Sequence, residues 1–201
     1  MAYERLLTGA TAIGLKLRDA VVLAAEKRVS YGGYVMSRSG KKVFKVSDRV
    51  AIAAAGLFAD MQTISRILSA EIRYRELLTS TRMRVRSIAK LLSTILYSYK
   101  YFPFLSEVLV GGVDDDGPHL FVLDFVGSLI EDDYAAVGTG ASIAIGIIES
   151  EYSPEMSIEK ARDLAVKAIK AAASRDVTSG DGIDLAIVTR DRVQEEFVPL
   201  A

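Results

Sequence analysis

The feature that most constrains the fold is the order in which strand-like and helix-like hydrophobic patterns follow one another. Patterns typical of strands occupy residues 11–17, 20–26, 42–46 and 50–55, then 108–113, 120–124 and 134–137, and finally 183–189 and 193–198. Helical spacing fills the two gaps between these groups, and a pair of helices is predicted in each gap. This order predicts an α+β fold in which two sheets pack face to face and a helix pair covers each outer face.

A glycine marks one of the junctions between a strand and a helix. The apolar run 50–55 ends at Gly56, and helical spacing begins directly after it. Unpaired N–H groups at a helix N-terminus favour negative charge, so this junction is suited to stabilising an anion. Thr79, Ser80 and Thr81 then interrupt the helical pattern, and we expect this triplet to cap the next helix.

An acidic turn separates two strand patterns in the middle of the chain. The sequence DDDGP at residues 114–118 is typical of a β-hairpin turn. The ligand spacing of an EF-hand and its closing glutamate are absent, so we expect a plain solvated turn and not a calcium loop. His119, the only histidine, lies beside this turn and is predicted to be a satisfied surface residue.

The composition limits the classes of partner and compartment. The chain of 201 residues fits one domain, and its 25 basic against 26 acidic residues create no global field for nucleic acid. The longest nearly apolar run, residues 50–59, is about half of the roughly 20 residues that a membrane span needs. No secretory signal precedes it, so the cytoplasm is expected. The positive mean hydropathy predicts an oligomer.

The residues available for catalysis are few. The chain has no cysteine and one histidine, so disulfides, thiolate metal sites and cysteine nucleophiles are excluded. The remaining routes are Ser or Thr with Lys, a carboxylate mechanism, or an N-terminal residue whose own amine is the base. The sequence favours the last, because residues 8–17 look like a processing site that runs into a strand. Gly9 would give the scissile bond an adaptable, closely approachable backbone.

At this point the chain resembles the β-type subunits of the 20S proteasome, the N-terminal-nucleophile threonine peptidases, and the archaeal subunits most of all. The matching segments are IGLK (13–16), RDAVVLAAEKR (18–28), GKKVF (40–44), AAGL (54–57), LVGGVD (109–114), AVGTG (136–140) and RDVTSG (175–180). They follow one another at the family's spacing along almost the full length. The α-type subunits differ, because they carry an extra N-terminal helix.

The resemblance implies an architecture and a set of partners. The fold would be the four-layer αββα sandwich of the Ntn-hydrolases, with a leader at residues 1–9 and one domain at 10–201. The expected reaction is hydrolysis of peptide bonds in unfolded polypeptides, with no metal or other cofactor. The expected partners are other β subunits in a homo-heptameric ring, proteasome α subunits and, indirectly, a ring ATPase unfoldase. No nucleic acid or membrane partner is expected.

The resemblance also implies roles for individual residues. Lys42 matches the catalytic lysine, and Glu26 matches its acidic partner, which is Asp in many relatives. Gly56 matches the residue whose backbone N–H forms the oxyanion hole. Asp176 and Ser179 match the pair that holds the surroundings of the nucleophile. Thr139 stands where relatives usually have Ser, and its hydroxyl can still form hydrogen bonds.

By the same offsets, five residues resemble those lining the pocket for the residue before the scissile bond. They are Val29, Gly40, Phe44, Ala54 and Phe58. Because all five are apolar, we expect a hydrophobic, chymotrypsin-like preference in an active site of this kind.

The sequence departs from the family at the nucleophile itself. Counting back from Gly14 places Ala10 where relatives have Thr, directly after Gly9 at the expected cleavage site. Alanine has no hydroxyl, so the leader should be retained and this chain should be inactive. Ala10 is interpreted either as an engineered Thr-to-Ala change that traps the precursor or as the natural residue of a non-catalytic structural β subunit in a mixed ring.

Two further alternatives stay open. Thr11 is the nucleophile if the register slips by one residue, although a slip turns each side chain to the opposite face of the strand unless a bulge restores it. A monomeric small-amide hydrolase of the same superfamily is the other alternative.

Overall fold

The computed structural model describes residues 9–31 and 33–200, so eight of the nine residues of the predicted leader lie outside the described residues. Two five-stranded antiparallel sheets form its centre. The first has the order β10-β1-β2-β11-β12. Its strands are β1 (Thr11–Lys16), β2 (Ala20–Glu26), β10 (Tyr134–Gly138), β11 (Ile183–Thr189) and β12 (Val193–Val198).

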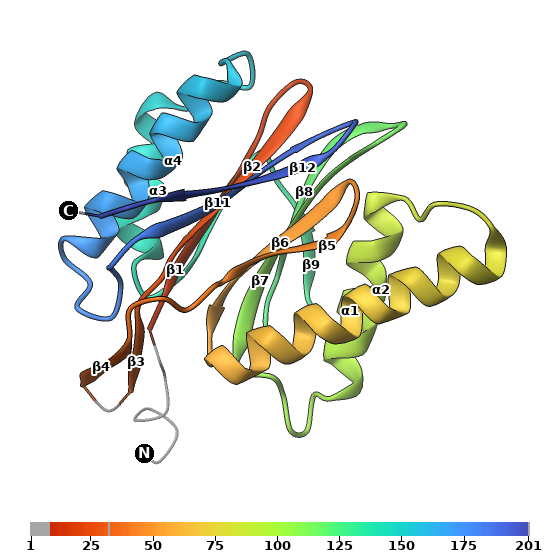
Figure 1. The fold of residues 1–201 in the computed structure, drawn as a ribbon, viewed down its shortest axis with the longest axis horizontal. Coiled ribbons are helices and arrows are strands. Elements are labelled where there is room, and N and C mark those ends of the chain that lie inside the picture. The colour runs from red at the N-terminus through yellow and green to blue at the C-terminus, as the bar shows by residue number, and fades with distance from the viewer. Residues whose placement is uncertain (1–8, 32, 201) are drawn as a thin grey trace.

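The second sheet has the order β5-β6-β7-β8-β9. Its strands are β5 (Val43–Ser47), β6 (Val50–Gly56), β7 (Ser106–Asp114), β8 (Gly117–Leu123) and β9 (Leu129–Glu131). A separate two-stranded hairpin, β3 (Val29–Tyr31) with β4 (Tyr34–Ser37), projects beyond the sheets (Figure 1). The sequence patterns did not predict this hairpin.

Two helix pairs complete the four layers. Helices α1 (Phe58–Thr79) and α2 (Val85–Ser98) cover the second sheet, and α3 (Ala141–Glu151) and α4 (Ile158–Ala173) cover the first. Figure 1 shows the two pairs on opposite sides of the paired sheets. Helix α4 begins as predicted, because the side chain of Ser157 accepts a hydrogen bond from the Lys160 N–H. The expected αββα sandwich is therefore confirmed.

The alternation of β1 divides its side chains between two hydrophobic clusters. Ala10 and Ala12 belong to the cluster between the sheets, which continues to α1 and α2. Ile13 and Leu15 belong to the cluster under α3 and α4. Successive strand residues point to opposite faces, so the two faces of this short strand meet different layers.

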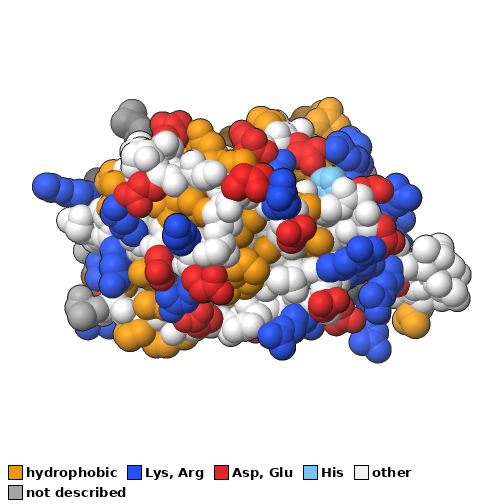
Figure 2. Space-filling view, turned by 90° about the horizontal axis from the view of Figure 1, so that it is seen from above, with side chains coloured by type: hydrophobic (Ala, Val, Ile, Leu, Met, Phe, Trp, Pro, Cys, Tyr) orange, Lys and Arg blue, Asp and Glu red, His pale blue; other side chains and the backbone are white. Residues whose placement is uncertain are grey.

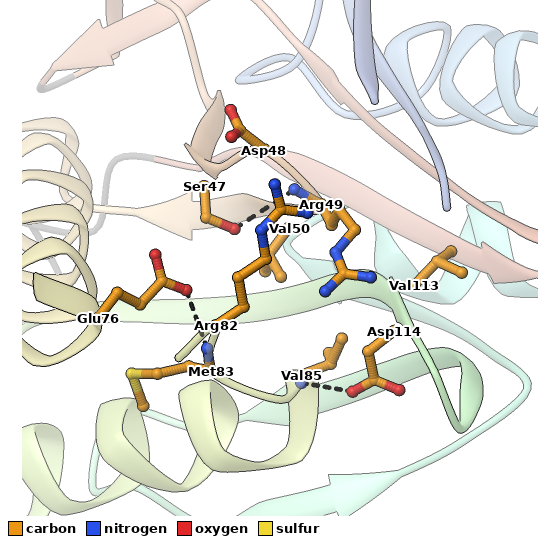
Figure 3. A pocket seen from close by; sticks show the side chains of 10 residues that line it. All are labelled: Ser47, Asp48, Arg49, Val50, Glu76, Arg82, Met83, Val85, Val113 and Asp114. Atoms are coloured by element: carbon orange, nitrogen blue, oxygen red, sulfur yellow. Dashed lines mark hydrogen bonds between the residues drawn. The ribbon is translucent and has the colours of Figure 1, made fainter. Parts of the chain in front are cut away.

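The connection between α1 and α2 differs from the expectation that Thr79–Thr81 caps the second helix. The helix begins at Val85, whose N–H is bound at 2.7 Å by the Asp114 carboxylate from the β7–β8 hairpin. The Met83 N–H is bound in the same way by Glu76, at 2.9 Å. Figure 3 shows both bonds around a small pocket of about 30 Å³. This pocket contains none of the candidate catalytic residues.

The acidic hairpin is only partly solvated. It was correctly predicted as a turn, but Asp114 is 6% exposed and serves as the cap described above. His119 is satisfied as expected and is itself half-buried, with Nδ1 at 2.7 Å from a Glu131 carboxylate oxygen.

Positive and negative side chains are interspersed on the face in Figure 2. Among the described residues, no helix combines the length and apolarity needed to cross a membrane.

Candidate active site

The predicted nucleophile position lies at the start of β1, in a tightly packed corner between the sheets. Ala10 is 1% exposed. Thr11 pairs with Gly138 on the neighbouring β10, and a Cβ on Gly138 would lie 2.1 Å from the Ala10 carbonyl oxygen. Gly138 also has φ +93°, so glycine is needed there for both space and backbone conformation. This close approach fixes the backbone of residue 10.

Glu26 and Lys42 form a buried ion pair beside this corner. Glu26 ends β2, Lys42 directly precedes β5, and the two side chains are 0% and 2% exposed. Lys42 Nζ donates to Glu26 Oε1 and, at 2.5 Å, to the carbonyl oxygen of Arg28. Glu26 Oε1 also faces the Thr11 N–H at 3.4 Å. The pair predicted from sequence is thus assembled and linked to the peptide that follows residue 10.

Further donors hold the Glu26 carboxylate in place. Its Oε2 accepts the N–H groups of Arg28, at 2.7 Å, and Gly180, at 3.0 Å. Burial lowers the pKa of the Lys42 ammonium, although the charge of Glu26 opposes this effect. A lysine with a lowered pKa gives up its proton more readily and is therefore suited to proton transfer.

A second carboxylate, Asp176, accepts hydrogen bonds from three hydroxyl groups near residue 10. Its Oδ2 accepts from Thr139 at 2.6 Å and from Ser179 at 2.7 Å, and its Oδ1 accepts the hydroxyl of Thr178 at 2.6 Å. Thr139 Oγ1 also lies 3.3 Å from the Ala10 carbonyl oxygen. All three predicted residues of this group, Asp176, Ser179 and Thr139, are therefore brought together near Ala10.

The hydroxyl donors set the charge state of Asp176. Burial alone would raise the pKa of this carboxyl, but the hydrogen bonds from Thr139, Thr178 and Ser179 more than offset burial and hold the pKa below its usual value. Thr178 was missed by the sequence reasoning. The available signal was its place two residues after an Asp, since an Asp side chain commonly accepts the N–H two residues on, as here at 3.0 Å.

Thr11, the alternative nucleophile, faces away from Ala10. Its hydroxyl lies 2.8 Å from the Ser179 hydroxyl, and the side chain is 0% exposed. A Cβ on Gly140 would lie 2.2 Å from Thr11 Oγ1. The register of β1 against β2 and β10 runs without a bulge, and Ala10 packs in the same cluster as Ala12, so residues 10 and 11 lie on opposite faces.

A cavity of about 420 Å³ opens beside residue 10. Its lining includes the predicted site residues Gly9, Ala10, Gly56 and Thr139. Gly56 ends β6, and only the N-cap residue Leu57 separates it from α1, in agreement with the predicted junction. Its φ is +134°, and a Cβ there would lie 2.2 Å from the Leu105 carbonyl oxygen. Only glycine fits this junction.

Four other residues of the cavity were not foreseen, namely Leu105, Ser106, Glu107 and Phe125. Glu107 pairs with Ala55 across β6 and β7, and its Oε2 accepts the Gly138 N–H at 2.8 Å. This cross-strand neighbour depends on register, which hydrophobic periodicity does not specify. The cavity thus combines apolar side chains with one carboxylate.

The five residues predicted to line a specificity pocket fall into two neighbouring groups. A Cβ on Gly40 would lie 2.3 Å from Val29 Cγ2 and 3.1 Å from Phe58 Cε2, so these three residues are in contact. Phe44 and Ala54 lie on the paired strands β5 and β6. None of the five, all within the described chain, lines the cavity beside Ala10.

Among the residues that the structure describes, the acidic side chains near the site are not arranged as metal ligands. Within residues 9–31 and 33–200, no group of three or more His, Cys, Asp or Glu side chains is arranged to hold a metal ion. The two carboxylates nearest residue 10 are instead satisfied by the donors described above.

Comparisons with known proteins agree with the geometry. Residues 6–188 match the family model described as "Proteasome subunit". The chain is 55% identical to proteasome subunit beta 1 of Hyperthermus butylicus, over the full length of both proteins. It is 54% identical to proteasome subunit beta 2 of Pyrobaculum calidifontis and 53% identical to that of Pyrobaculum aerophilum, and each alignment covers at least 96% of both chains. The chain therefore belongs to the proteasome subunit family, as a β subunit similar to those of archaea.

Proposed function

We propose that this β subunit belongs to a 20S core particle and carries a threonine-type endopeptidase site built around position 10, and that Ala10 leaves this chain uncleaved and inactive. The observation that carries the proposal is the convergence on Ala10 of the buried Glu26–Lys42 pair, the Asp176 cluster and the cavity lined by Gly56. Each of these three features meets a separate requirement of acyl transfer. What is missing is a hydroxyl at residue 10.

With threonine at position 10, the residues of this chain supply the nucleophile and the proton transfers that peptide-bond hydrolysis needs. The hydroxyl oxygen attacks the carbonyl carbon of Gly9 during processing, or that of a substrate residue afterwards. In the mature subunit its proton passes to the residue's own amine with help from Lys42, and then to the departing amine. The Gly56 amide faces the developing oxyanion. Water then hydrolyses the ester and restores the hydroxyl.

The opposite orientations of residues 10 and 11 support position 10 as the nucleophile. The Thr11 hydroxyl is buried against Ser179 on the face toward α3 and α4, whereas Ala10 lines the cavity. An attack from Thr11 would require its side chain to leave that packing and cross the strand.

The expected substrates are unfolded polypeptides, cleaved after apolar residues. This preference is assigned to Val29, Gly40, Phe44, Ala54 and Phe58, which are all apolar and lie outside the cavity that Ala10 lines. Large apolar side chains that a single chain leaves exposed support assembly into rings with β and α subunits. Among them are Leu77, Leu78, Tyr101, Phe102 and Val177. An unfoldase feeding the particle and a cytoplasmic location belong to the same proposal.

The test restores the missing hydroxyl. Ala10→Thr, co-assembled with α subunits, should hydrolyse fluorogenic peptides with apolar residues before the cleaved bond faster than those with Arg or Glu. Ala10→Val is the matched control, because valine has the shape of threonine without its hydroxyl. If neither leader loss nor peptidase activity appears with Ala10→Thr, the proposal is wrong. The chain is then the alternative, a structural subunit of a mixed ring. Faster cleavage after Arg or Glu would overturn the proposed specificity.

A further inference from the structure

Residue 9 has no room for a side chain. A Cβ on Gly9 would lie 1.8 Å from Thr178 Oγ1, 2.5 Å from Thr178 Cβ and 2.7 Å from Thr139 Oγ1. Contacts this short between a Cβ and a neighbouring heavy atom do not occur, so any substitution at Gly9 must displace these side chains.

The backbone of Gly9 does not itself require glycine. Its φ lies outside the left-handed region, whereas Gly33 and Gly117 have φ values of +90° and +117° with open space around them. At those two positions the conformation demands glycine, and at Gly9 the surrounding atoms do. Of the two roles that the sequence suggested for Gly9, an adaptable backbone and a close approach of neighbouring atoms, the structure shows the close approach.

The side chain of Thr178 cannot turn aside without losing the hydrogen bond that its hydroxyl donates. Its hydroxyl donates to Asp176 Oδ1 at 2.6 Å, and its N–H binds the same oxygen at 3.0 Å. The other oxygen, Oδ2, is already bound by Thr139 and Ser179. Because a β-branched side chain has few allowed rotamers, turning Thr178 away would break its bond to the carboxylate.

We propose that Thr178 restricts residue 9 to glycine and thereby determines which leader junction this site can process. The inference rests on the proposed function for its processing role. The site would therefore accept only glycine as the residue that contributes the carbonyl group to the bond between residues 9 and 10. Thr178 acts as a positioning and specificity-determining residue, because its hydroxyl and methyl-bearing carbon occupy the space of the missing side chain.

The contact itself is tested in the full chain with Ala10 unchanged, where no chemistry is needed. Gly9→Ala should lower the Tm, and adding Thr178→Gly should recover most of that loss relative to Thr178→Gly alone. Thr178→Ala should recover less, because its Cβ remains 2.5 Å from the new side chain. Thr178→Val keeps the shape and removes the hydroxyl, so it should recover nothing. Additive changes in Tm for Gly9→Ala and Thr178→Gly would overturn the contact.

The specificity is tested in the Ala10→Thr background by following leader loss over time. Gly9→Ala should slow processing by roughly tenfold or more, as expected for overpacking, and Thr178→Gly should restore it to within about threefold of the Gly9 rate. Processing of Gly9→Ala at the unaltered rate, or no rescue by Thr178→Gly, would overturn the role. If Ala10→Thr with Gly9 is not processed, the proposed function fails, and the Tm comparison still decides the contact.

Discussion

Two of the carboxylates near residue 10, those of Glu26 and Asp176, are satisfied in opposite ways. Glu26 is fully buried and is paired with the charged Lys42, whose side chain is 2% exposed. Asp176 is half-buried and is held by three neutral hydroxyl groups. One region is a dry ion pair, and the other is a cluster of hydroxyls around an anion.

The difference indicates which region serves stability. Burying two charges costs several kcal/mol per ion, and apolar residues of the same volume are often at least as stable. Hydroxyl donors around a partly exposed anion carry no such desolvation penalty for a second charge. Stability alone therefore does not account for the Glu26–Lys42 pair, which is consistent with the proton transfer proposed for it, whereas the Asp176 cluster contacts the backbone at residue 10.

The largest effect is expected when the ion pair is broken from one side. Lys42→Ala leaves the Glu26 carboxylate buried without its cation, and the free energy of unfolding should fall by ~3–5 kcal/mol in urea titrations. The control is Lys41→Ala at the adjacent residue, whose side chain is 48% exposed and pairs with Glu195. It should change stability by less than about 0.5 kcal/mol. Equal small losses for Lys42→Ala and Lys41→Ala would contradict the cost expected from leaving Glu26 charged and buried without its partner.

A smaller loss is expected in the hydroxyl cluster. Asp176→Asn keeps the shape but replaces one accepting oxygen with an NH₂ group, so the hydroxyls of Thr139, Thr178 and Ser179 lose part of their acceptor. The expected loss is about 1–2 kcal/mol in the same titration. Asp48→Asn is the control, since its side chain is 76% exposed. A loss as large as that of Lys42→Ala would contradict the smaller desolvation penalty expected for the partly exposed cluster.

The smallest effect is a pH dependence confined to the cluster. The folded-state pKa of Asp176 lies below its unfolded value of about 3.9, so the charged form stabilises the fold above that pH. This contribution is lost as pH falls through the folded pKa. The stability difference between the unmodified chain and Asp176→Asn should therefore be constant from about pH 7 to 5 and shrink below about pH 4. A difference that does not change at about pH 3 would contradict the assignment.

Hydrophobic periodicity predicted most of the fold because several central strands are apolar runs buried on both faces, whereas the helices bury one face each. Met61, Ile64 and Leu68 recur at helical spacing and are buried along α1. The β3–β4 hairpin escaped prediction because Tyr34, Val35 and Met36 are apolar but exposed, so they show no alternation between a buried and a solvated face. Strand order and register also depend on tertiary packing that a single sequence does not display.

Apart from Gly56, which the strand-to-helix junction indicated by itself, the candidate site residues came from the resemblance and not from local patterns. Glu26, Lys42 and Asp176 are far apart in the chain, and nothing in local spacing brings them together. Thr178 and Glu107 were missed for the complementary reason. Thr178 contacts Gly9 and Glu107 binds the Gly138 N–H, and both contacts join segments that are distant in the chain. The resemblance assigned no role to Thr178 or to Glu107.

The central claim, that only the hydroxyl at residue 10 is missing, is tested most directly by intact mass measurement of assembled Ala10→Thr particles. We predict that the β subunit loses the mass of residues 1–9 and begins at the introduced threonine, while Ala10→Val keeps its full mass. A full-length Ala10→Thr subunit, or a mature chain that begins at Thr11, would contradict the account.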